Sequence, residues 1–359
     1  MTKSDTYYES ELIFDSGRPT AVPLLSVCLS TYRVADCVEV ALRTILNQTC
    51  DDYEVVIQDD CSSDDTISVV LNYLKGCESW TARRVRVFRS KENFGILANR
   101  LKGFAHSDGE WFIQADGDDF SPEYRIEKTK EMLERLEDGT VLVVTNRFDW
   151  WNGASYDEVV NGANKVYDFG DSYFTSNDQV NARHPQGSNG FIVSRRLFER
   201  FKDSVPKTRI ICDDPVLARR ATLVGKIFIW GEPIFYCRRS ETSASGGGTN
   251  PKLMLLDVCN RLDLLVEDIM LVSRDHKVPD RVAKDVKHKR LCYFLDAQLA
   301  DCSYLIWPFR WVRLFFVSRK MAAQAFKERI RLFFCGNIRA SIRKRFGMKV
   351  SFYHLYRKK

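Results

Sequence analysis

Short apolar segments alternate with helical patterns along the first 120 residues. The apolar segments have the length of strands and are rich in aliphatic and aromatic residues. They lie at residues 24–29, 53–58, 85–88 and 111–115. Between the first two, apolar residues recur at the i, i+3/i+4 spacing of a helix, at Val38, Ala41, Leu42, Ile45 and Leu46. This alternation predicts βαβ units, and hence an α/β fold with a mostly parallel central sheet flanked by helices.

Polar residues cluster directly after each predicted strand. The clusters are Ser30-Thr31-Tyr32-Arg33, residues 59–66, residues 91–95 and residues 116–119. The carboxyl ends of parallel strands meet along one edge of a sheet, where open α/β sheets bind their ligands. We therefore expect a nucleotide site assembled from several loops.

Three carboxylates stand within four residues in Asp116-Gly117-Asp118-Asp119. Carboxylates this close repel one another unless a cation neutralises them. Oxygen ligands suit magnesium or manganese, which usually bind together with substrate phosphates. The chain has neither a G-x-G-x-x-G after its first strand nor a G-x-x-x-x-G-K-[ST]. We therefore expect diphosphate to be held through a metal rather than by a glycine-rich loop.

Two other interpretations of this acidic run were considered. A calcium-binding loop of the EF-hand type needs Gly at position 6 and an oxygen ligand at position 5, where this chain has Ser121 and Phe120. A helix should also precede such a loop, whereas a strand is predicted here. An acidic turn that caps a helix starting at Ser121-Pro122 stays open as an alternative.

The first 240 or so residues resemble a family 2 glycosyltransferase of the GT-A fold, the inverting kind common in bacterial polysaccharide assembly. The order and spacing of several stretches match the family, which is more specific than any single motif. These stretches are Ser30-Thr31-Tyr32, Ile45-Leu46-Asn47-Gln48-Thr49, Tyr53 to Thr66, Asn93-Phe94-Gly95, Gly109-Glu110-Trp111 and Asp116-Gly117-Asp118-Asp119.

The resemblance implies how the donor nucleotide would bind. Ser30, Thr31, Tyr32 and Asp60 would hold the nucleobase, with Tyr32 beside its face, and Asn93 would belong to the same site. A carboxylate at Asp60 can accept a hydrogen bond from the imide N–H of uracil or thymine, which cytosine lacks. A UDP-linked sugar is therefore the expected donor.

The resemblance also implies roles for the acidic run. Asp116 would contact the ribose side of the donor, and Asp118 would coordinate a divalent metal, Mn or Mg, that bridges the diphosphate. Asp119 would be a neighbour of the metal site or a weaker ligand. For Asp64 we prefer a helix-capping role to a ligand role, because acids favour the first turn of a helix.

Three positions depart from the family pattern. The family usually has Asn, Val and Gly where this chain has Arg33, Gln58 and Cys61. Because positive φ is rare outside glycine, the backbone at Cys61 either avoids that region or is strained. No carboxylate is lost, so the departures bear on the base and sugar preference rather than on the fold.

An acidic pair, Asp213-Asp214, precedes Pro215 and a helical pattern. In the family, an acidic pair at this place opens a helix and its second member is the catalytic base. The resemblance thus makes Asp214 the base and Asp213 its neighbour. Inverting transfer needs one carboxylate to deprotonate the acceptor hydroxyl. The alternative is that both acids only cap the helix.

Three further residues are candidates for contacts with the leaving phosphates or the acceptor. They are His184, Arg238 and Arg239. A guanidinium pairs phosphate oxygens in bidentate fashion, which favours the two arginines, whereas a lone His is more often structural. The Gly- and Ser-rich residues 243–249 predict a flexible linker, with a lid over the donor as the alternative.

Composition restricts the compartment and the cofactors. The chain has 45% apolar residues and eleven cysteines, with no C-x-x-C pair. We therefore expect neither zinc nor a disulfide framework, and a reducing cytoplasmic setting. The polar start is not followed by a signal-peptide core, and no apolar run approaches the ~18 residues of a spanning helix.

The net charge of +6 is distributed unevenly. Residues 307–359 hold fifteen Lys or Arg and one acid, Glu328, interleaved with Trp and Phe. Basic amphipathic segments with aromatic residues suit an anionic lipid surface, so we expect peripheral attachment to the inner face of the cell membrane. A helical subdomain packed on the catalytic domain and a nucleic-acid patch are the alternatives, and we expect no nucleic-acid partner.

These observations divide the chain into four parts. They are an N-terminal extension (1–22), a GT-A catalytic domain (23–245, with a donor half 23–120 and an acceptor half 121–245), a linker with helices (246–306) and an α-helical basic tail (307–359). We expect a metal-dependent inverting glycosyltransferase that moves a sugar from a nucleotide-diphosphate donor to a glycan acceptor. The acceptor is expected to be linked to polyprenyl diphosphate, as in O-antigen or capsule assembly. The alternatives are a nucleotidyltransferase and a non-catalytic sugar-nucleotide-binding or scaffold relative.

Overall fold

The computed structural model describes seven segments and a few residues of the C-terminal part. These are residues 6–17, 23–77, 80–82, 84–151, 170–174, 190–239 and 251–273, then 288, 291, 294, 312, 314–319, 322 and 323. The chain divides into two compact units, one of Met1–Thr249 with Asn260–Lys287 and the other of Asn250–Cys259 with His288–Lys359. All strands of the described segments belong to the first unit.

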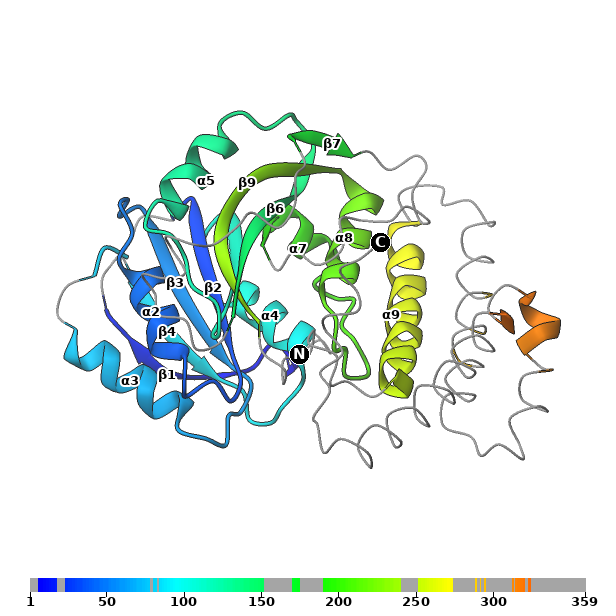
Figure 1. Cartoon of the computed structure of the whole chain (residues 1–359), viewed down its shortest axis with the longest axis horizontal. Coiled ribbons are helices and arrows are strands. Elements are labelled where there is room, and N and C mark those ends of the chain that lie inside the picture. Colours follow the sequence, from blue (N-terminus) through cyan, green and yellow to red (C-terminus); the bar gives the residue numbers. More distant parts are fainter. Residues whose placement is uncertain are drawn as a thin grey trace, which may run out of the picture. The chain divides into compact units, whose positions relative to one another are not determined.

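The described strands form one sheet in the order β1-β4-β3-β2-β5-β8-β6-β9-β7 (Figure 1). Their bounds are β1 Glu11–Asp15, β2 Leu25–Thr31, β3 Tyr53–Asp59, β4 Arg84–Arg89, β5 Trp111–Asp116, β6 Thr140–Trp151, β7 Ser172–Phe174, β8 Phe191–Ser194 and β9 Lys226–Arg239. The four predicted strands are β2 to β5, and they lie parallel to one another. β6 and β9 are also parallel, whereas β1, β7 and β8 pair antiparallel. The sheet is thus mixed and mostly parallel at its centre, as expected.

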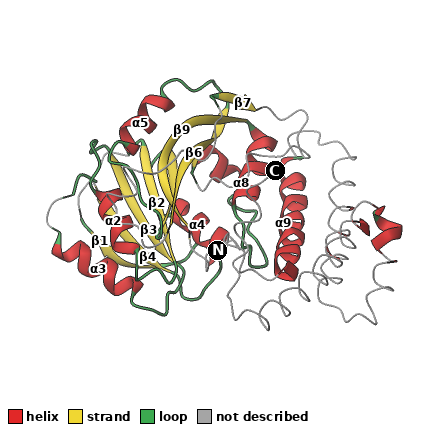
Figure 2. Ribbon diagram, in the orientation of Figure 1, coloured by secondary structure: helices red, strands yellow, loops and turns green. Residues whose placement is uncertain are grey.

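Helices cover both faces of this sheet (Figure 2). Their bounds are α2 Val38–Leu46, α3 Thr66–Gly76, α4 Ile96–Ala105, α5 Arg125–Leu133, α7 Arg195–Phe201, α8 Asp214–Val224 and α9 Pro251–Val272. Side chains alternate between the faces along each strand. Val27 and Leu29 therefore pack with α2, α3 and α5, while Cys28 packs with α4, α7 and α8. All five apolar residues predicted to share one face of α2 are buried.

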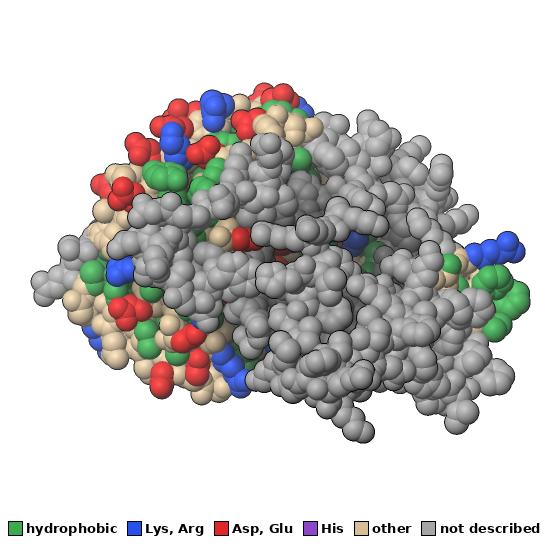
Figure 3. All heavy atoms as spheres, in the orientation of Figure 1, with side chains coloured by type: hydrophobic (Ala, Val, Ile, Leu, Met, Phe, Trp, Pro, Cys, Tyr) green, Lys and Arg blue, Asp and Glu red, His purple; other side chains and the backbone are tan. Residues whose placement is uncertain are grey.

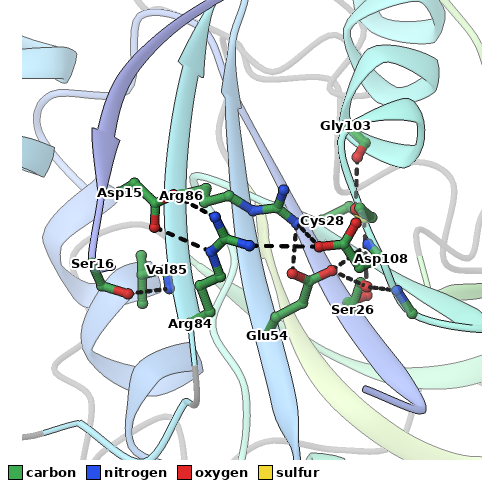
Figure 4. A network of polar contacts seen from close by, with 12 residues as sticks. Asp15, Ser16, Ser26, Cys28, Glu54, Arg84, Val85, Arg86, Gly103 and Asp108 are labelled. Atoms are coloured by element: carbon green, nitrogen blue, oxygen red, sulfur yellow. Dashed lines mark hydrogen bonds and ion pairs between the residues drawn. The ribbon is translucent and has the colours of Figure 1, made fainter. Parts of the chain in front are cut away.

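A buried ionic network fixes the register of the parallel strands at their amino-terminal ends (Figure 4). Glu54 in β3 is fully buried and accepts hydrogen bonds from Ser26 Oγ at 2.6 Å and Arg86 Nη2 at 2.7 Å. Its carboxylate also accepts the backbone N–H of Asp108. This network lies at the opposite end of the strands from the polar clusters, so it stabilises the sheet without occupying the loop edge.

Surface charge on the described part of the molecule is mixed. The face drawn in Figure 3 carries acidic and basic side chains side by side over the described elements. In the segments that the structure describes, no helix combines the length and apolar character needed to cross a bilayer.

Candidate active site

The parallel register brings the predicted polar clusters together at one sheet edge. Ser30, near the end of β2, lies opposite Gln58 on β3 and opposite Asp116 on β5. Thr31 lies opposite Asp59, and its carbonyl accepts the backbone N–H of Asp60 at 3.0 Å. The clusters after β2, β3 and β5 therefore meet, as the alternation of strands and helices predicted.

Asp60 holds the loop that follows β4. Its two carboxylate oxygens accept the backbone N–H groups of Phe94 and Gly95, each at 2.8 Å. Burial raises the pKa of Asp60, although these two hydrogen bonds oppose the shift. Gly95 has a φ of 92°, and a Cβ there would lie 2.6 Å from Cγ of Arg209. A glycine is therefore required at this point of the Asn93-Phe94-Gly95 stretch.

Asn93 lies in the same loop with an unused amide. Both its Oδ1 and its Nδ2 are buried, and neither has a hydrogen-bond partner among the described residues. Buried amide groups without partners are uncommon and usually indicate a missing water or ligand. Asn93 thus remains a candidate for a ligand contact.

Arg33 and Cys61 are the described non-glycine residues with positive φ, at 53° and 60°. These are two of the three positions that depart from the family pattern, so the backbone at Cys61 is strained rather than rearranged. The Arg33 guanidinium lies 5.3 Å from the ring centroid of Tyr32, which is 37% exposed. Tyr32 is therefore partly exposed at the sheet edge, with the Arg33 guanidinium over its ring.

The neighbouring acid, Asp64, lies one residue before the N-cap residue of α3, Asp65, and makes local hydrogen bonds at the start of that helix. Its Oδ1 accepts the hydroxyl of Thr66 at 2.7 Å and the backbone N–H of Thr66 at 3.3 Å, where α3 begins. Its other oxygen accepts the N–H of Ala35 at 3.3 Å. Asp64 thus joins two loops instead of facing a ligand.

The acidic run after β5 folds as a tight turn. The backbone N–H of Gly117 donates to Ser30 O at 2.9 Å, and a Cβ on Gly117 would lie 2.9 Å from Cγ2 of Val34. Asp119 Oδ1 accepts the backbone N–H of Arg238 at 2.8 Å. Asp118 makes no hydrogen bond or ion pair with the side chain of another described residue. The two predicted metal ligands therefore differ, because Asp119 is engaged with β9 and Asp118 is not.

Both alternatives for this run are excluded by the local structure. The run follows strand β5 and not a helix, which argues against an EF-hand. Helix α5 begins at Arg125 instead of Ser121-Pro122, and its N-cap residue, Tyr124, makes no side-chain cap. The acids therefore do not cap α5.

Carboxylates crowd this edge and raise one another's pKa. Burial, and then the charge of Asp116, raise the pKa of Asp118 to about 6. Burial also raises the pKa of Asp116, where the charge of Asp213 adds to the shift and Arg100 opposes it. Burial, followed by the charges of Asp118 and Asp116, raises the pKa of Asp119. A cation bound among these groups would remove the repulsion.

Arg100 connects this run to the acidic pair that precedes α8. Its side chain is 2% exposed, its Nε donates to Asp213 Oδ2 at 2.7 Å, and its Nη2 lies 2.9 Å from Asp116 Oδ1. Gln114 Nε2 donates to the same oxygen of Asp213 at 3.3 Å. The donor-side acid and the predicted base pair therefore lie around one guanidinium.

Asp214 is the first residue of α8 and has an unpartnered carboxylate oxygen. Oδ1 is buried without a hydrogen-bond partner among the described residues. Burial, followed by the charge of Asp213, raises the pKa of Asp214 well above its usual range, while Arg100 opposes the shift. Asp213 occupies the N-cap position of α8, but its side chain makes no capping hydrogen bond. Helix capping therefore does not account for the acidic pair.

Sequence reasoning missed Arg100, Gln114 and Arg125. The guanidinium of Arg125 is buried, donates to Gln114 O at 2.7 Å and lies near Asp119 and Asp116. One signal was available for Arg100, which interrupts the apolar face of a helix between Leu97 and Leu101. A charged residue at a core-facing position needs a buried partner, so it could have been linked to the acidic clusters.

The carboxylates of the site fit a divalent cation whose remaining ligands come from the substrate. The carboxylates at positions 116, 118, 119, 213 and 214 outnumber the two buried guanidinium groups beside them, those of Arg100 and Arg125. No three acidic, His or Cys side chains converge as a metal cage within the described segments. Magnesium typically binds through one or two carboxylates together with substrate phosphates and water, which suits Asp118.

The three candidate phosphate or acceptor residues are only partly described. His184 and the side chain of Arg239 lie outside the described residues, as do residues 243–249. Arg238 lies in β9, where its Nη2 donates to Asp36 at 3.1 Å and its backbone donates to Asp119. Next to it, Tyr236 and Phe120 exchange two backbone hydrogen bonds, which fixes the end of β9 against the acidic run.

Comparison with known proteins gives matches to glycosyltransferases. Residues 26–198 match the glycosyl transferase family 2 model. A Bacillus subtilis protein named as a candidate teichuronic acid biosynthesis glycosyltransferase, TuaG, is 32% identical over 114 residues, covering 32% of this chain and 43% of that protein. The GalNAc(5)-diNAcBac-PP-undecaprenol beta-1,3-glucosyltransferase of Campylobacter jejuni is 35% identical over 100 residues, covering 27% of this chain and 30% of that protein. The matched part thus spans less than half the length of either relative.

Solved structures show the same fold. The crystal structure of S. aureus TarS 1–349 has a TM-score of 0.53 at 17% identity, covering 85% of this chain and 82% of that one. The same TarS segment in complex with UDP-GlcNAc has a TM-score of 0.52 at 15% identity, covering 87% and 92%. Identity this low supports the fold alone, a GT-A-like sheet flanked by helices. Residues 26–198 therefore form a glycosyl transferase family 2 domain.

Proposed function

We propose that the chain is a metal-dependent, inverting glycosyltransferase that uses a UDP-sugar and a lipid-linked glycan acceptor. The observation that carries the proposal is the division of labour among the acids. Arg100 holds Asp116 and Asp213, while Asp118 and Asp214 keep carboxylate oxygens that no described residue contacts by a hydrogen bond. One free acid is thus left for a metal and one for a proton.

The donor base would bind at the edge formed by Ser30, Thr31, Tyr32 and Asp60. The exposed ring of Tyr32 offers a stacking face, and the oxygens of Asp60 retain lone pairs beyond those used by the loop N–H groups. The unpartnered amide of Asn93 supports a further contact in the same loop. TarS, which shares the fold, has been crystallised with UDP-GlcNAc, and this supports a uridine donor.

Asp118 would hold the divalent metal, Mn or Mg, with diphosphate oxygens completing its shell. When bound, such an ion neutralises the charge that develops on the leaving diphosphate. Asp119 would be a neighbour of this metal site, with its Oδ1 held by the backbone N–H of Arg238. Arg125 lies near Asp119 and Asp116 and partly offsets their charge.

Asp214 would act as the general base. It takes the proton of the acceptor hydroxyl as that oxygen forms a bond to the anomeric carbon, and the bond from that carbon to the diphosphate breaks with its electron pair leaving on UDP. The single displacement inverts the configuration and needs no second nucleophilic acid. Burial and the charge of Asp213 raise the pKa of Asp214, which makes its carboxylate a stronger base.

A polyprenyl-diphosphate-linked acceptor is proposed from the relatives and the tail. The C. jejuni relative is named for a PP-undecaprenol-linked substrate. Most of the basic tail, residues 307–359, lies outside the described residues. In the part of the second unit that is described, Phe316 is 82% exposed, and the Arg319 guanidinium lies 5.6 Å from the Phe315 ring centroid. An exposed aromatic beside cations supports binding to the surface of an anionic membrane.

The proposal is tested by donor hydrolysis and binding with a panel of UDP-, GDP- and dTDP-sugars, with Mn²⁺ or with EDTA. We expect turnover of a UDP-sugar that requires metal and is lost in Asp118→Ala. Binding without turnover, with or without a polyprenyl-diphosphate glycan, would support a non-catalytic relative. Absence of binding to every donor would refute the transferase.

Attachment of the tail is tested separately by flotation of the full chain with vesicles. We expect the chain to float with vesicles that contain anionic phospholipid and to remain unbound with neutral ones. Equal behaviour with both vesicle types would refute the membrane role of residues 307–359.

A further inference from the structure

Arg100 is the one side chain within the described segments that pairs with both acidic motifs of the site. It projects from α4, whose buried residues also include the apolar Leu97 and Leu101 and the polar Asn99 and Lys102. Its partners come from distant parts of the chain, Asp116 at the end of β5 and Asp213 just before α8. A single guanidinium therefore connects the donor half of the domain to the acceptor half.

We propose that Arg100 is a positioning residue for glycosyl transfer, which fixes the first turn of α8, and with it Asp214, relative to the end of β5. The inference rests on the proposed function and deepens it. It assigns the two members of the acidic pair different tasks, with Asp213 as the anchor and Asp214 as the free base.

Asp213 makes hydrogen bonds through both its side chain and its backbone. Its Oδ2 accepts two hydrogen bonds, from Arg100 Nε and from Gln114 Nε2. Its carbonyl accepts the N–H groups of Val216 at 2.8 Å and Leu217 at 3.2 Å, which start α8. The side chain of Asp213 thus binds to α4 and β5 while its backbone begins the helix. Any movement of Asp213 would carry Asp214 with it.

The geometry requires a guanidinium in particular. Arg100 uses Nε for Asp213 and Nη2 for Asp116, so two different N–H groups of one planar fork reach two carboxylates. A lysine has a single charged nitrogen and cannot hold both acids at fixed, separate directions. The guanidinium therefore fixes the separation and the relative orientation of the two carboxylates, in addition to neutralising part of their charge.

Stability alone does not explain a buried arginine at this position. Buried ion pairs and triads can often be replaced by apolar residues of similar volume without loss of stability. Leu97 and Leu101 flank Arg100 on the same buried face, so an apolar residue would pack there naturally. What an apolar residue cannot supply is the orientation of Asp213 and Asp116.

The test uses Arg100→Met, Arg100→Lys, Asp213→Asn and the double variant Arg100→Met/Asp213→Asn. Steady-state kinetics with the UDP-sugar that the donor panel selects give kcat and KM. Calorimetry with UDP and Mn²⁺ gives the Kd of the nucleotide. Each full-length variant is first checked by thermal unfolding.

Arg100→Met should lower kcat by about 100-fold, because a displacement of about 1 Å at a catalytic group costs that much. The Kd of UDP should rise by less than about tenfold, since Arg100 reaches the donor only through Asp116. Arg100→Lys should recover less than about a tenth of the lost kcat, because the fork is missing. Asp213→Asn should lower kcat while leaving the Kd of UDP unchanged.

The double variant separates positioning from independent effects. If Arg100 and Asp213 act as one unit, the double variant should be within about threefold of Arg100→Met alone. If the fold-changes in kcat of the two single variants multiply in the double variant, the inference is wrong. Should Arg100→Met fail to fold, Arg100→Lys and Asp213→Asn still decide the question, since both conserve size and polarity.

Arg220→Met is the matched control. Arg220 lies in α8 itself, is 2% exposed, and its Nε and Nη2 lie 2.9 and 3.0 Å from the two oxygens of Asp268. Its loss should lower the unfolding temperature and leave the kcat of the folded enzyme within about twofold, because the pair touches no site carboxylate. If Arg100→Met behaves like Arg220→Met, Arg100 is only structural.

Asp214→Asn distinguishes failure of this inference from failure of the proposed function. Full turnover by Asp214→Asn would refute the base itself. An inactive Asp214→Asn together with near wild-type kcat in Arg100→Met and Asp213→Asn would keep the base and refute the positioning role.

Discussion

Replacing Cys61 by glycine should stabilise the chain relative to replacing it by alanine. Cys61 has a φ of 60°, and its Sγ lies 3.4 Å from the carbonyl oxygen of Lys91. Both substitutions remove that weak sulfur contact, so it cancels from the comparison. The two variants then differ in the Cβ atom, which is the source of the strain in a left-handed backbone.

The size of the difference follows from two opposing terms. A residue with a side chain costs about 1–2 kcal/mol in the left-handed region. Glycine gains freedom in the unfolded chain and so loses about 0.5–1 kcal/mol relative to alanine. The central values of these two terms, about 1.5 and about 0.75 kcal/mol, make the free energy of unfolding of Cys61→Gly about 0.75 kcal/mol higher than that of Cys61→Ala.

Urea unfolding followed by tryptophan fluorescence measures this difference, provided that the two variants show the same slope with denaturant. The midpoint of Cys61→Gly should lie above that of Cys61→Ala. An alanine variant that is equally stable or more stable would show that the backbone at position 61 relaxes and carries no strain.

Four further predictions concern the acids. Asp214→Asn should reduce transfer by at least about 100-fold while UDP still binds, as measured by kinetics and calorimetry. Because the pKa of Asp118 is raised to about 6, Mn²⁺ should bind more weakly below that pH, as calorimetry at pH 5 and 7.5 would show. In the metal-free folded state Asp118 has a raised pKa, so it keeps its proton at a pH where the unfolded chain has lost it. The free energy of unfolding should therefore fall as pH rises through about 6, and Asp118→Asn should remove that fall. Glu54→Ala should lower the free energy of unfolding by about 1–3 kcal/mol, because Ser26 and the N–H of Asp108 lose their buried acceptor while Arg86 keeps its ion pair with Asp108.

Each of these has a result that would contradict it. Transfer by Asp214→Asn at the wild-type rate would mean that another group takes the proton. Manganese affinity that does not change with pH would mean that Asp118 is not a ligand. Glu54→Ala as stable as wild type would mean that the network at the amino-terminal ends of the strands is not a significant anchor.

The elements of the donor half were predictable because each follows a local period. The apolar residues of α2 and the runs of β2 to β5 are patterns within a dozen residues, and parallel pairing then gathers the loops at one edge. The positions of Asp116, Asp118 and Asp60 could be predicted for the same reason. The hydrogen bond of Asp64 to Thr66 was likewise predictable, since its partner is two residues away.

What the sequence did not reveal depends on contacts between distant segments. Asp119 is engaged by the backbone N–H of Arg238, which pairing of Phe120 with Tyr236 brings close. The position of Arg100 among apolar residues of α4 indicates a buried charge, but its partners, Asp116 and Asp213, are brought to it only by the packing of β5 and α8. β1 was assigned to an extension, because five residues before a long gap show no period of their own.

Strand β1 has a consequence for self-association. It lies antiparallel to β4, outside the residues that match the family model, and covers the outer hydrogen-bonding groups of that strand. A chain trimmed to residue 26 would expose those groups along six residues of β4, an open template on which a second molecule could add a strand. β1 itself is a poor template, since it has five residues, a register shift between Leu12 and Phe14, and an acid at each end. The segment that the family pattern omits thus protects the sheet from aggregation through this edge.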